Sequence, residues 1–61
     1  MKEDLNQIAK TMISQYGDEA SVIAMMRAAE FAAANNQEEW IRWEKIIKII
    51  ESYNVKPDLD S

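Results

Sequence analysis

The feature that most constrains this chain is the segment from Ala20 to Ala34, ASVIAMMRAAEFAAA. Twelve of its fifteen residues are apolar, and its polar side chains are Ser21, Arg27 and Glu30. The many alanines make the segment a strong helix former. A helix that is apolar nearly all round has to be covered on most of its sides. Either the rest of the chain or a second molecule has to supply that cover.

The length of the chain limits how much cover it can supply. A domain of 61 residues buries only about 60% of the surface that its unfolded chain exposes. Small domains are commonly stabilised by disulfides, a metal, tight helix packing or oligomerisation. The sequence has no Cys and no His, so a disulfide is excluded and a zinc site would need carboxylates alone, which is unusual. We therefore expect no metal and no cofactor, and a homodimer with tightly packed helices.

The charge balance narrows the choice of partners. Seven Lys and Arg against eleven Asp and Glu give a net charge of −4, which disfavours nonspecific binding to nucleic acid or to an anionic membrane. The N-terminal sequence MKEDLNQIAK lacks the apolar run of a signal peptide. Arg27 and Glu30 interrupt the best candidate for a membrane span. We expect a soluble cytoplasmic protein with no membrane partner.

Hydrophobic spacing predicts an all-α fold of three helices, over about residues 3–16, 18–35 and 37–53. Apolar residues recur at steps of three and four from Leu5 to Tyr16, as in an amphipathic helix. We expect the middle helix to form the shared core of a homodimer. The third helix carries a broad apolar face made of Trp40, Trp43, Ile46, Ile47, Ile50 and Tyr53.

Short corners are expected between these helices. Gly17, the one glycine of the chain, is expected to be a left-handed C-cap, and Asp18 is expected to be the N-cap of the middle helix. Asn35 and Asn36 form the second corner, where Asn36 with Glu39 three residues later resembles a capping box.

The chain is expected to form one domain over residues 1–55, followed by a polar tail over 56–61. Asn54 and Pro57 are expected to end the third helix, since Asn accepts the left-handed cap and Pro cannot continue a helix. Pairs four residues apart, Glu38 with Arg42 and Glu44 with Lys48, are expected to add a little stability to this helix.

Nine residues are candidates for an interface. Trp40 and Trp43 are either large residues of the core or anchors of a binding surface, where Trp is enriched. Arg27 and Glu30 allow two interpretations. Either they are an exposed pair at the solvent edge of the middle helix, or Arg27 binds a carboxylate of another helix or subunit and fixes the packing register. The full set of candidates is Met25, Met26, Arg27, Glu30, Phe31, Trp40, Trp43, Ile47 and Ile50.

The methionines allow two interpretations. Met25 and Met26, together with Met12, are expected to fill gaps in an alanine-rich core. The alternative is an adaptable surface of the kind that binds varied helices.

No residue set indicates catalysis. The chain lacks His and Cys, and acid–base chemistry by carboxylates needs a water-poor cleft, which three short helices hardly provide. We expect a non-enzymatic module that self-associates and acts as a regulator or inhibitor by binding another protein. No catalytic, cofactor-binding or metal-binding residue is predicted.

The alternative function is DNA-binding transcriptional regulation through the third helix. Arg42, Lys45 and Lys48 step along this helix, as in a recognition helix. However, acidic residues are interleaved with these cations, whereas a helix that enters the major groove usually keeps them away from phosphates. Nucleic acid is therefore not the expected partner.

Several short motifs resemble a group of short all-helical proteins of alphaproteobacteria that have no assigned activity. The motifs are Ile8-Ala9, Tyr16-Gly17-Asp18-Glu19-Ala20, Ala24, Arg27, Ala28-Ala29, and Trp43 followed by Ile46 and Ile50. The resemblance spans about residues 5–53 and implies a small helical domain of bacterial origin.

Overall fold

A computed structural model describes residues 4–53 of the chain. The helix α1 covers Leu5–Tyr16, a 3-10 turn η1 covers Gly17–Glu19, α2 covers Ala20–Ala33 and α3 covers Gln37–Tyr53. The described part of the chain is therefore all-helical and contains no strand. The predicted caps Asn54 and Pro57 and the tail over 56–61 lie outside the described residues.

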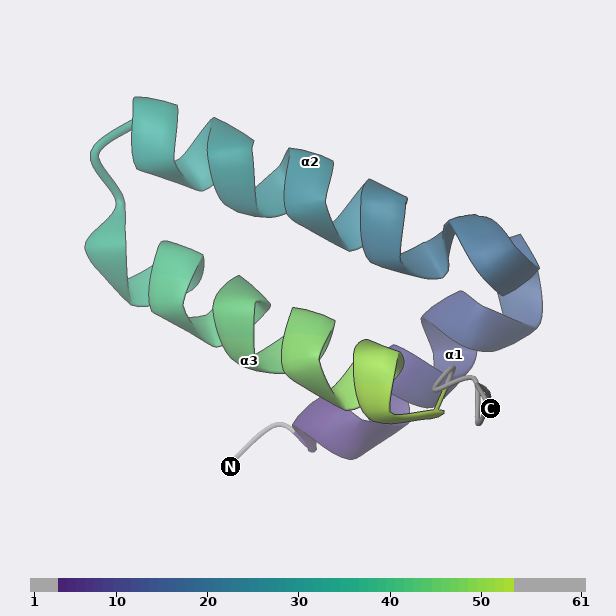
Figure 1. The fold of residues 1–61 in the computed structure, drawn as a ribbon. Helices are drawn as coiled ribbons and strands as arrows, with labels where there is room; N and C mark the ends of the chain where they lie inside the picture. The colour runs from purple at the N-terminus through teal and green to yellow at the C-terminus, as the bar shows by residue number, and fades with distance from the viewer. Residues whose placement is uncertain (1–3, 54–61) are drawn as a thin grey trace, which may run out of the picture.

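The prediction of three separate helices needs correction. Helical turns continue without a break from Leu5 to Ala33, so α1, η1 and α2 form one bent helical run and α3 forms the second. Figure 1 shows the chain changing direction at η1, after which α2 and α3 run side by side in opposite directions. The helix α1 lies against the C-terminal half of α3.

Asp4 begins α1. Its side chain accepts a hydrogen bond from the backbone N–H of Asn6 at 3.1 Å, and its extended backbone is that of an N-cap. The helix α1 therefore begins at Leu5 and not near the predicted residue 3.

Gly17 produces the bend between α1 and α2. Gly17 is the C-cap of α1, as predicted, but the predicted left-handed conformation is wrong, because its φ is 60° and its ψ is −127°. Its N–H donates to the carbonyl of Ile13. The predicted N-cap role of Asp18 is wrong, because η1 leads directly into α2: Glu19 precedes α2 in helical geometry with no side-chain cap, and the N–H of Ala20 donates to the carbonyl of Gly17.

Asn35 and Asn36 form the second corner, as predicted. Asn35 has a φ of 64°, and the N–H groups of Asn35 and Asn36 donate to the carbonyls of Ala32 and Phe31 at 3.0 and 2.9 Å. These two bonds make a Schellman motif, so α2 ends at Ala33 and not at the predicted residue 35.

The start of α3 matches the prediction. Asn36 accepts a hydrogen bond from the N–H of Glu39 at 3.3 Å, which is the N-cap half of a capping box. The Glu39 carboxylate binds Arg42 instead of completing the box, with 2.7 Å between Oε1 and Nη1. The helix α3 begins at Gln37, as predicted, and its described part extends to Tyr53.

The core is built around α3 and not around the middle helix. Ile46 and Ile50 of α3 are fully buried, and α3 packs against both α1 and α2, whereas α1 and α2 contact each other less. The helix α2 contributes small side chains, which allow its backbone to approach α3 closely. The buried residues are Ala9, Met12, Ala20, Ala24, Ala28, Ile46, Ile47 and Ile50.

The molecule is elongated and thin. Its principal extents are 40 × 26 × 17 Å and its radius of gyration is 12.4 Å, whereas a near-spherical domain of this length has about 10 Å. In Figure 1, α2 and α3 lie side by side and α1 lies at the end where α3 finishes. The sides of α2 and α3 that carry Val22, Met26 and Ile41 are exposed in the described part of the chain.

Candidate interaction surface

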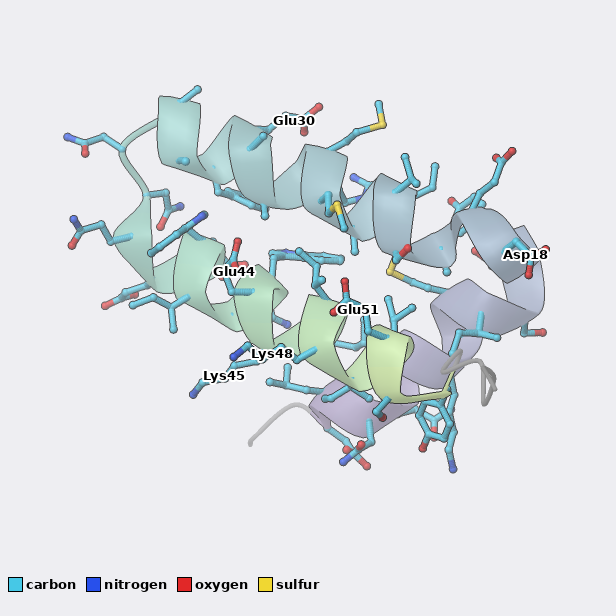
Figure 2. All side chains as sticks on the ribbon, in the orientation of Figure 1. Asp18, Glu30, Glu44, Lys45, Lys48 and Glu51 are labelled. Carbon is cyan, nitrogen blue, oxygen red and sulfur yellow. The ribbon has the colours of Figure 1, made fainter. Side chains whose placement is uncertain are left out.

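The structure exposes five of the nine interface candidates. Met25 and Met26 are 46% and 57% exposed, and Trp40 is 39% exposed. Arg27 and Glu30 are also exposed, and Figure 2 shows Glu30 on the side of α2 that faces away from α3. These five side chains are therefore accessible to another molecule.

The methionines divide between the two interpretations. Met12 is buried in the core, as gap filling predicts. The same prediction is wrong for Met25 and Met26, because their positions on α2 point away from the alanines that pack on α3. These two methionines lie on the surface, as the alternative interpretation predicts.

The remaining candidates lie further inside. Ile47 and Ile50 are buried in the core, so these two predicted interface residues are corrected to core residues of the chain itself. Phe31 and Trp43 are half-buried, and Trp43 packs against the core. Of the two tryptophans, Trp40 thus belongs to the surface and Trp43 to the core.

Other apolar residues on the exposed side of α2 did not emerge from the sequence. Val22 is 52% exposed, and Ala29 and Ala33 are also exposed. The signal that identifies them is their position on the helix, since they lie opposite the buried Ala24 and Ala28 at 100° per residue. This signal becomes usable only once the core side of α2 is known.

A shallow pocket lies at the corner between α2 and α3. Its volume is about 200 Å³ and it is open to solvent, whereas ligand pockets usually hold about 300–1,000 Å³ and bury most of the ligand. Its wall joins Ala32 of α2 to Trp40 of α3, so the exposed apolar surface of α2 continues onto the start of α3. The lining residues are Ala32, Asn35, Asn36, Gln37 and Trp40.

Four charged side chains of α3 lie on two different sides of the helix. Figure 2 shows Glu44 and Glu51 on the side toward α2, and Lys45 and Lys48 on the side away from α2. Arg42 forms an ion pair with Glu39 at 2.7 Å, three residues away, where the sequence predicts Glu38 as its partner. A pair this exposed contributes about 0–1 kcal/mol.

Residues 4–53 contain no group of three or more side chains that could hold a metal ion. Every buried side chain in this range is apolar. None of the helices described here is long and apolar enough to cross a membrane. The exposed side of α2 therefore provides mainly apolar contact area, with Arg27 and Glu30 as its charged side chains.

Comparison of the chain with models of known protein families, with curated proteins and with solved structures finds no match. The resemblance to the helical proteins of alphaproteobacteria therefore stays a prediction.

Proposed function

We propose that this chain is a non-enzymatic interaction module that self-associates as a homodimer and regulates or inhibits another protein by binding it. The observation that carries the proposal is the exposed apolar side of α2, where Val22, Met25 and Met26 are each about half exposed. Single exposed apolar residues are ordinary on a protein surface, whereas contiguous ones mark interaction sites. A cytoplasmic location is part of the proposal.

The small core supports self-association. The buried side chains within residues 4–53 are alanines, three isoleucines and one methionine. Burying a large aliphatic side chain contributes about 1.5–3 kcal/mol, and an alanine methyl contributes much less. A second molecule on the exposed side of α2 adds apolar burial that the chain does not achieve alone.

Sedimentation equilibrium tests self-association. We expect a mass of about 14 kDa at about 100 µM, which is twice the 7.0 kDa of one chain. A wild-type chain that sediments as a monomer at this concentration would overturn the proposal.

A pair of matched variants locates the surface. Met26→Glu places a charge on the exposed side of α2, and we expect it to weaken the dimer without unfolding the chain. Ile41→Glu places the same charge at a similarly exposed position of α3, where Ile41 is 48% exposed, and we expect the dimer to persist. Circular dichroism of both variants controls for folding. Equal weakening by both variants would contradict the assignment of the interface to α2.

The second candidate function is DNA binding through α3. The observation in its favour is the exposure of Lys45 and Lys48 on the side of α3 away from α2 (Figure 2). A gel shift with mixed genomic fragments at low salt discriminates between the two functions. The proposal for an interaction module expects no shift, whereas binding that weakens steeply with salt would favour the DNA-binding function.

A further inference from the structure

Four exposed residues form a continuous stripe along α2, here called the outer stripe: Val22, Met26, Ala29 and Ala33. Their spacings of four, three and four residues place them within a sector of about 60° on the helix surface. All four are exposed, while Ala24 and Ala28 on the opposite side are buried. The outer stripe is therefore the part of α2 that the described chain leaves without cover.

The outer stripe is bulky at one end and small at the other. Val22 and Met26 occupy its N-terminal half, and Ala29 and Ala33 occupy its C-terminal half. Because the spacing is symmetrical, reversing the direction of a second copy puts each bulky residue opposite an alanine. A parallel second copy would place methionine against methionine and alanine against alanine, which leaves gaps between the alanines.

We propose that the occupant of the outer stripe is a second copy of this chain, packed antiparallel so that Val22 faces Ala33 of the second copy and Met26 faces its Ala29. This inference rests on the proposed self-association and specifies its geometry. The two-fold axis then passes beside α2 between residues 27 and 28, since both pairs are symmetrical about that point.

Cysteine cross-linking tests this geometry, because the chain has no native Cys. We would prepare Val22→Cys and Ala33→Cys and oxidise each alone and as an equimolar mixture. A disulfide needs Cα atoms within about 7 Å. The antiparallel register brings position 22 opposite position 33, while like positions lie about 16 Å apart along the axis. We therefore expect covalent dimers mainly in the mixture and with one chain of each kind.

Ile41→Cys is the matched control, since it places an equally exposed thiol on α3. We expect little cross-linking of this variant, alone or mixed with Val22→Cys. Rapid cross-linking of Val22→Cys with itself would instead indicate a parallel or a nonspecific pair and would overturn the inference.

Sedimentation equilibrium of the reduced variants separates the two possible failures. A chain that is dimeric but gives no mixed cross-link contradicts the antiparallel register and leaves self-association intact. A monomeric chain contradicts both self-association and the antiparallel register. The outer stripe would then be a binding site for a helix of a different protein.

A size swap gives a second test that does not depend on cysteine. Ala29→Met puts two methionines opposite each other in the antiparallel pair, and we expect the dimer dissociation constant to rise roughly tenfold or more. Adding Met26→Ala to the same chain restores one bulky and one small residue in each pair. We expect the double variant to recover most of the lost affinity. If it is weaker than the single variant, the proposed pairing is wrong.

Discussion

The two long helices of the hairpin contrast in composition and in role. The helix α2 is the most apolar segment of the chain, yet it buries only Ala20, Ala24 and Ala28. The helix α3 alternates charged and apolar residues, yet it supplies the buried Ile46, Ile47 and Ile50. Burial in this molecule therefore follows amphipathic pattern and side-chain size, not total apolar content.

Side-chain size explains why α3 takes the central position. An isoleucine removes far more apolar area from water than an alanine, so packing α1 and α2 against the isoleucine face yields the larger hydrophobic stabilisation. The alanines of α2 let it approach that face closely. Its larger side chains, Val22, Met25 and Met26, are left on the other side.

The largest loss of stability is expected from substitution of a buried isoleucine of α3. Ile46→Ala removes a fully buried side chain, and we expect a loss of about 2–5 kcal/mol in the free energy of unfolding, enough to unfold a domain of this size. Ile41→Ala makes the same change at a position that is 48% exposed and should cost about 0.5 kcal/mol or less. Urea unfolding followed by circular dichroism measures both. Equal losses would show that Ile46 is not central to the core.

The close approach of α2 to α3 is tested by adding volume between them. Ala24 is fully buried, so Ala24→Leu has no space to fill, and we expect a loss of about 1–3 kcal/mol. Ala29→Leu adds the same atoms on the exposed side of α2. At a dilution where the chain is monomeric, we expect its free energy of unfolding to change by about 0.5 kcal/mol or less. A stable Ala24→Leu variant would mean that the helices are not in close contact.

The bend before α2 is expected to contribute less. Gly17 has a φ of 60°, and a Cβ added there meets no atom within 4 Å, so Gly17→Ala is strained only through its backbone. We expect a loss of about 1–2 kcal/mol in the free energy of unfolding. D-alanine at position 17 of a synthetic chain adds the same methyl group and accepts a positive φ, so it should fold at least as stably as the wild type. If D-alanine costs as much as L-alanine, backbone strain is not the cause.

Local signals allowed the start of α3 to be predicted from the sequence. Asn36 caps the helix through the N–H of Glu39, and the apolar spacing after it continues to Tyr53 without a competing pattern. The C-cap position of Gly17 was predictable for the same reason. The failure at Asp18 has a specific cause: a good capping residue still needs an extended backbone, and here the 3-10 turn carries helical geometry straight into α2.

The surface of α2 was less predictable. Apolar residues lie all round this helix, so its sequence does not mark which side faces the core. That side is decided by the isoleucine face of α3, and α3 is remote in sequence from the first turns of α2. The exposure of Val22 and Met26, and the burial of Ile47 and Ile50 among the interface candidates, therefore follow from packing between helices and not from any local pattern.

The smallest expected loss of stability comes from substitutions at the starts of α2 and α3. Asn36→Gln and Asp18→Glu each lengthen an exposed side chain by one methylene and leave its charge unchanged. Asn36 accepts the hydrogen bond of a helix cap, so its variant should lose about 1 kcal/mol. Asp18 does not cap α2, so its variant should change the free energy of unfolding by less than about 0.5 kcal/mol. A shift of the urea midpoint with an unchanged m-value would report the difference, and equal shifts would mean that α2 also begins at a side-chain cap, with α1 and α2 as two separate helices.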